Sequence, residues 1–105
     1  MIEKLENNIY CVSENNFPQN SEELLNALKK MLPRDLIIVL PKPNYWSPHL
    51  LEPLVNYQQR QKKTLVWVLS TRYSNLLPSE WPTVPTMQEA LDYIQFEQMQ
   101  RDLGF

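Results

Sequence analysis

The chain has 105 residues, which is enough for one domain and too few for two sizeable cores. Ten basic and twelve acidic side chains leave a formal net charge of −2, so the clustered basic excess typical of nucleic-acid binding is missing. One cysteine, one histidine and one glycine exclude an internal disulfide framework, a histidine-rich metal site and a glycine-rich phosphate loop. No apolar run approaches the roughly 20 residues that span a bilayer as a helix. We therefore expect a cytoplasmic protein without a membrane, nucleic-acid, metal or cofactor partner.

The first elements predicted along the chain are a hairpin and a helix. Short β-like runs at residues 2–5 and 9–13 flank Asn7 and Asn8, and asparagine tolerates the left-handed backbone of a tight turn. An N-cap asparagine with a glutamate three residues later then opens an amphipathic pattern, whose apolar side chains recur on one face. We expect this helix over residues 20–32, with a proline directly after its end.

Two continuous apolar runs, at residues 36–40 and 65–69, predict strands over residues 35–40 and 64–70 that are covered on both faces. A second helix lies between them. Ser47 is a good N-cap, and Pro48 suits the first helical position. Pro53 lies deeper and removes a backbone hydrogen bond, so either the helix is kinked there or it begins near Leu50.

The last third of the chain predicts an irregular segment, a short strand and a helix. Residues 71–82 contain two prolines and allow no more than one short helical turn, at residues 74–77. Residues 83–84 suit a short edge strand. Thr86 and Glu89 then form a Thr-x-x-Glu capping box that opens the final helix. Strands that alternate with helices predict an α/β domain, with a mixed sheet of four to five strands and about three helices packed against it.

The final helix carries two apolar faces. At about 100° per residue, the first face lies near Met87 and comprises Ala90, Leu91 and Ile94. The second face lies almost opposite and comprises Phe96, Met99 and Leu103. We assign residues 1–95 to the domain and residues 96–105 to an extension of its last helix. Either the second face is a docking strip, or the chain bends after the first face and folds back.

Few side chains elsewhere suggest chemistry, and we expect no catalytic residue. We interpret Ser47, at the start of the second helix, first as an N-cap. If Ser47 carried a phosphate, the free backbone N–H groups at the start of that helix would stabilise it. His49 has only Glu52 as an acidic neighbour, which does not make a catalytic pair. Cys11 lies in an apolar strand and is expected to be a buried, inert thiol.

Three aromatic side chains lie in proline-flanked loops: Tyr45, Trp46 and Trp81. They could line a small-ligand pocket or a partner surface, because tryptophan and tyrosine are frequent anchors of interfaces. They could equally cap the open ends of the sheet. Trp67 lies inside a predicted strand and is assigned to the core.

The order of elements, residues 84–94 (Val-Pro-Thr-Met-Gln-Glu-Ala-Leu-Asp-Tyr-Ile) and residues 101–105 (Arg-Asp-Leu-Gly-Phe) resemble the STAS domain of bacterial anti-sigma factor antagonists. More narrowly, the chain resembles a divergent branch of short bacterial STAS-like proteins. The resemblance implies a non-enzymatic protein–protein interaction module, open to a regulatory role. In the family motif Asp-Ser-Ser-Gly-Leu, only Ser47 and Leu50 align with their counterparts, so the binding role carries over better than the phosphorylation switch.

We therefore expect a module that binds another protein or a second copy of itself. Its candidate partner-binding residues are Ser47, His49, Phe96, Met99 and Leu103. The alternative is a small-ligand-binding protein that uses the aromatic loops around Tyr45, Trp46 and Trp81.

Overall fold

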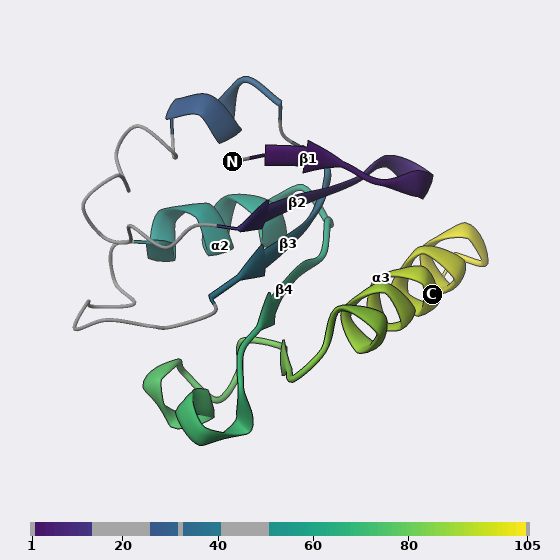
Figure 1. The fold of residues 1–105 in the computed structure, drawn as a ribbon. Helices are drawn as coiled ribbons and strands as arrows, with labels where there is room; N and C mark the ends of the chain where they lie inside the picture. Colours follow the sequence, from purple (N-terminus) through teal and green to yellow (C-terminus); the bar gives the residue numbers. More distant parts are fainter. Residues whose placement is uncertain (1, 14–25, 32, 41–50, 105) are drawn as a thin grey trace.

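A five-stranded mixed sheet forms the centre of the molecule in the computed structural model, which describes residues 2–13, 26–31, 33–40 and 51–104 (Figure 1). The strands are β1 (Ile2–Lys4), β2 (Ile9–Ser13), β3 (Asp35–Val39), β4 (Leu65–Val68) and β5 (Thr83–Val84), and they lie in this order across the sheet. β1 is antiparallel to β2, and each later pair of neighbours is parallel. The predicted α/β class with a mixed sheet is confirmed.

The β1–β2 hairpin turns through a short 3₁₀ segment, η1 (Glu6–Asn8). Asn7 and Asn8 have φ angles of 61° and 58°, in the left-handed region that asparagine tolerates. The Leu5 N–H donates to the Ile9 carbonyl at 2.7 Å and closes the turn. The hairpin predicted from the asparagine pair is therefore confirmed.

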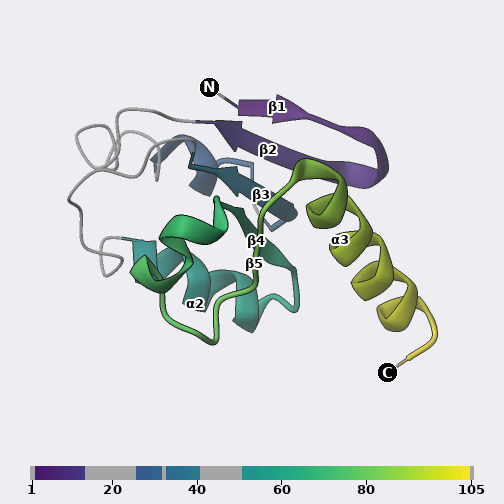
Figure 2. The same ribbon diagram turned by 60° about the horizontal axis from the view of Figure 1, so that its bottom comes forward.

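Helices cover both faces of the sheet (Figure 2). A helical segment at residues 26–29 and α2 (Glu52–Arg60) pack on one face, in a cluster that includes Leu28, Leu36 and Trp67. α3 (Met87–Asp102) packs on the other face, in a cluster that includes Ile37 and Val66. Right-handed crossovers between sequential parallel strands lie on one face, so the helix that follows the last strand is left to cover the other.

α2 begins at Glu52, which places Pro53 in its first turn. A proline costs no helical hydrogen bond there, because the first N–H groups of a helix have no partner within the helix. Of the two predicted alternatives, the later start is the one found. Leu54 and Val55 are buried against the sheet, as their spacing predicts.

The segment between β4 and β5 is more ordered than its sequence suggests. It contains a 3₁₀ helix, η3 (Thr71–Leu76), where only a short turn at residues 74–77 was expected. The Ser70 side chain accepts the Arg72 N–H at 3.4 Å and caps it. Leu77 and Trp81 are buried in the core on the α2 face and anchor the segment that follows. Because η3 is held in place by side chains outside it, its own sequence shows no periodic pattern from which the helix could be predicted.

α3 opens at the predicted capping box. The Thr86 hydroxyl accepts the Glu89 N–H at 3.2 Å, and the two side chains are hydrogen-bonded at 2.8 Å. The helix then runs unbroken to Asp102, so the expected alternative of a bend after Ile94 is wrong. No helix in the described part of the chain is long and apolar enough to cross a membrane.

Candidate functional site

Three large apolar side chains stand in solvent on the outer side of α3. Phe96 and Met99 are each 59% exposed, and Leu103 is 66% exposed. Their spacing of three and then four residues aligns them along one stripe of a helix. We call these three residues the α3 strip. The other large apolar side chain that stands exposed in the described ranges is Leu76, in η3.

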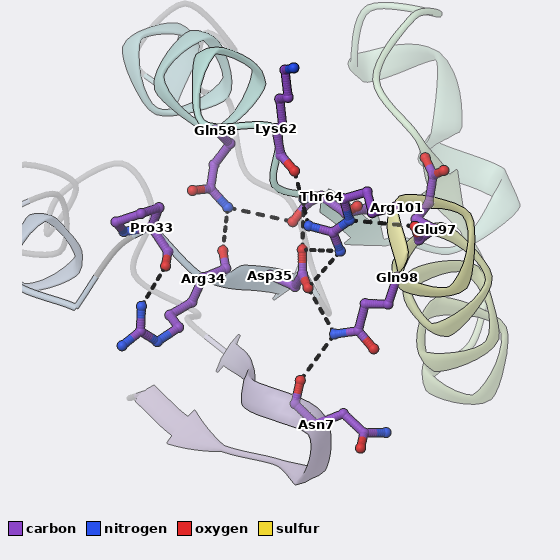
Figure 3. A network of polar contacts seen from close by, with 10 residues as sticks. All are labelled: Asn7, Pro33, Arg34, Asp35, Gln58, Lys62, Thr64, Glu97, Gln98 and Arg101. Carbon is purple, nitrogen blue, oxygen red and sulfur yellow. Dashed lines mark hydrogen bonds and ion pairs between the residues drawn. The ribbon is translucent and has the colours of Figure 1, made fainter. Parts of the chain in front are cut away.

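The opposite side of the same helical turns is polar and is bonded to the sheet (Figure 3). Gln98 donates its amide hydrogens to the Asn7 carbonyl at 3.0 Å and to Asp35 Oδ2 at 2.8 Å. Arg101 Nη2 lies 3.0 and 2.9 Å from the two Asp35 oxygens, and Nη1 donates to the Lys62 carbonyl at 2.9 Å. We call the group formed by Asp35, Gln98 and Arg101 the Asp35 network.

Asp35 is a buried carboxylate at the first position of β3, with only 3% of its surface exposed. Its Oδ1 also accepts the Thr64 N–H at 2.9 Å, so both oxygens are hydrogen-bonded. Burial by itself raises the pKa of the Asp35 carboxyl. The hydrogen bonds that it accepts and the positive charge of Arg101 outweigh burial and hold this pKa below its usual range. The network therefore contains an ionised acid paired with a cation.

The two halves of α3 are thus held by different forces. Ala90 and Ile94 in the first half are fully buried against the sheet. The second half has its apolar side chains outside and is fixed from inside by charge and hydrogen bonds. Residues 96–102 continue the helix and are tied to β3 by the Asp35 network. This arrangement sets the direction in which the α3 strip faces.

A polar hollow of about 460 Å³ lies beside the Asp35 network, between the hairpin turn and the end of α3. Both arginines of its lining already have partners within the protein. Arg101 is neutralised by Asp35, and the Arg34 guanidinium turns away to donate to the Pro33 carbonyl at 2.7 Å (Figure 3). Within the described ranges no three histidine, cysteine, aspartate or glutamate side chains gather closely enough to hold a metal ion.

The aromatic loops are described only in part. Tyr45, Trp46, Ser47 and His49 lie outside the described residues. Trp81 is buried and stacks on Trp67, with ring centroids 5.2 Å apart and planes inclined by 10°. It also borders a cavity of about 180 Å³ together with Tyr93 and Glu97.

Cys11 is buried, and burial, followed by the nearby Glu3 carboxylate, raises the pKa of its thiol. A thiol with a raised pKa stays protonated at neutral pH and is a poor nucleophile. The expected burial of Cys11 is confirmed, and its lack of reactivity stays a prediction.

Sequence reasoning missed Asp35, Gln98 and Arg101 as a group. A signal for part of it was present. On the same helical wheel, Gln98 and Arg101 fall at about 20° and 320° from Met87, on the face that packs against the sheet. Long polar side chains on a buried face require buried partners. A lone aspartate opening a fully apolar strand is such a partner.

Comparison with protein-family models, with curated proteins and with solved structures found no match for this chain. The α3 strip and the network behind it are therefore the features of this chain that bear on its function.

Proposed function

We propose that this chain is a non-enzymatic protein–protein interaction module and that the α3 strip is its docking surface. The observation that carries this proposal is the exposure of three neighbouring large apolar side chains, two on α3 and the third, Leu103, at its C-cap. Each square ångström of apolar surface removed from water contributes about 25 cal/mol, so covering such a strip favours association. Contiguous exposed apolar surface commonly marks interaction sites.

The Asp35 network supports the same proposal. It fixes Gln98 and Arg101 on the inner side of the helix, so the strip cannot turn inward without breaking an ion pair to a buried carboxylate. A surface that is already ordered loses less conformational entropy when it binds. The strip is therefore presented to a partner in one fixed orientation.

The proposal includes kinship with STAS-like interaction modules and a regulatory role in the cytoplasm. Its supports are the mixed α/β sheet, the order of the elements, and the C-terminal helix opened by Thr86 and Glu89. The partner under this proposal is another protein or a second copy of the chain.

The test replaces Leu103 with aspartate. We expect Leu103→Asp to weaken association at least about tenfold, because it removes an apolar contact and would bury a charge in the interface. The fold should be unaffected, within about 0.5 kcal/mol, since this side chain is largely in solvent. Sedimentation of the chain with its captured partner measures the association, and thermal unfolding measures the fold.

Leu76→Asp is the matched control, because Leu76 is also about half exposed but lies in η3, away from the strip. Association lost with Leu103→Asp and kept with Leu76→Asp supports the docking surface. Equal association for both variants and the wild-type chain contradicts it.

A second candidate function is the binding of a small ligand beside Trp81. The observation that favours it is the cavity of about 180 Å³ bordered by Trp81, Tyr93 and Glu97. Tryptophan fluorescence titrated with a set of metabolites tests it; a saturable change that Trp81→Phe abolishes favours ligand binding over docking.

A further inference from the structure

The stripe of α3 on which the α3 strip lies continues toward the start of the helix, where its side chains are acidic. Glu89 and Asp92 are exposed and precede Phe96 at the same alternating spacing of three and four residues. On the helical wheel they fall at about 200° and 140° from Met87, within or beside the sector of about 120° to 180° that the strip occupies. One continuous stripe of α3 is therefore acidic over its first turns and apolar over its last.

Among the described residues, no lysine or arginine side chain pairs with the two acidic side chains of this stripe. The Glu89 carboxylate accepts the Thr86 hydroxyl at 2.8 Å, and Asp92 accepts the Gln88 amide at 3.0 Å. Both donors are neutral, so both negative charges remain. The single basic residue of α3, Arg101, is committed to Asp35 on the inner side. The stripe thus offers negative charge beside apolar surface.

We propose that the occupant of the α3 strip is an amphipathic helix of a partner protein whose contacting stripe is apolar over about two turns and basic over the next two. This inference rests on the proposed function and specifies the partner by charge complementarity. Apolar side chains of the partner cover Phe96, Met99 and Leu103, and lysine or arginine side chains reach Glu89 and Asp92. Helix-on-helix recognition uses the same spacing of anchors.

A second copy of the chain fits this stripe less well. Parallel pairing of two α3 helices sets Glu89 against Glu89 and Asp92 against Asp92, and like charges in contact are unfavourable. Antiparallel pairing centred on Met99 matches Phe96 with Leu103 but covers only the three strip side chains of each copy. This pairing leaves Glu89 and Asp92 of both copies without a positively charged partner. Antiparallel pairing shifted toward the helix start buries carboxylates against apolar side chains.

The test uses two synthetic helical peptides and the full chain. One peptide carries leucines along one stripe over two turns, with lysines continuing the stripe. The second has glutamates in place of those lysines. Fluorescence anisotropy of the labelled peptides reports binding. We expect the lysine peptide to bind the chain more tightly than the glutamate peptide, by about threefold to tenfold at low salt and less at high salt.

The variant Asp92→Lys reverses one charge of the stripe. It should lower the affinity for the lysine peptide about threefold to tenfold and raise the affinity for the glutamate peptide by a similar factor. Glu80→Lys is the control: it makes the same change of net charge at an exposed position outside α3, and both affinities should stay within about twofold.

The outcomes separate this inference from the function on which it rests. If the two peptides bind equally well and Leu103→Asp abolishes the binding of both, the basic partner is overturned and the docking surface is still supported. If Leu103→Asp does not change peptide binding, the α3 strip is not the binding surface, and the proposed function is contradicted as well. Absence of binding by either peptide, or self-association that Leu103→Asp disperses, overturns the basic helix as the occupant.

Discussion

Asp35 is the residue on which the orientation of the last helix depends. It is 3% exposed and receives hydrogen bonds from Thr64, Gln98 and Arg101. Taking a charge out of water is costly unless it is paired and fully hydrogen-bonded, and this carboxylate meets both conditions. A buried ion pair does not necessarily add stability over an apolar pair of the same shape. Removal of one partner, however, leaves the other as a buried charge without compensation, which is strongly destabilising.

We therefore expect Arg101→Met to destabilise the fold by about 2 kcal/mol or more, because it leaves a buried carboxylate without its cation. Urea unfolding measures the change in free energy. Hydrogen exchange of the backbone amides after Ile94 should also speed up, since the polar attachment of these turns is lost.

The same substitution at Arg60 serves as the control for Arg101→Met. Arg60 is exposed in the last turn of α2, so Arg60→Met should change stability by less than about 0.5 kcal/mol. The double variant Asp35→Asn with Arg101→Met should cost less than the two single changes added together. Strict additivity would mean that the two residues do not act as a pair.

At the scale of elements, much of the fold was readable from local pattern. The two continuous apolar runs became β3 and β4, and the Thr86–Glu89 box became the start of α3. Each of these signals lies within a few neighbouring residues. The two-faced pattern of the last helix also located the α3 strip, with Phe96, Met99 and Leu103 exposed as the docking alternative requires.

What local pattern could not supply is the pairing between distant elements. Asp35 meets Gln98 and Arg101 across sequence separations of 63 and 66 residues. No periodicity relates positions so far apart; the sheet and the docking of α3 bring them together. The ordered η3 segment was missed for the same reason, since Leu77 and Trp81 hold its far end by packing in the core.

At the scale of the whole molecule, α3 is the only helix of the described chain on its face of the sheet, and the attachment of its second half depends on an ionised acid. Stability should therefore depend on pH through Asp35. Its pKa is lowered in the folded state relative to about 3.9 in an unfolded chain. The stabilisation from this group is fully present above about pH 5, falls as the unfolded chain begins to bind protons, and is lost as the pH falls through the folded pKa.

Comparison with Asp35→Asn isolates this contribution from that of the other carboxylates. The difference in unfolding free energy between wild type and variant should be constant between about pH 5 and 7 and should shrink steadily below about pH 4. Urea titrations across this range measure it. A difference that does not change with pH would show that the ionisation of Asp35 does not stabilise the fold.

The long separation between Asp35 and its partners also orders the events of synthesis. A nascent chain holds all five strands once Val84 has left the ribosome, yet Gln98 and Arg101 are still to come. Until they emerge, a native-like sheet would bury the Asp35 charge without its cation, which is unfavourable. Completion of the domain therefore waits for α3, and a chain interrupted after the last strand should stay open to chaperones and proteases.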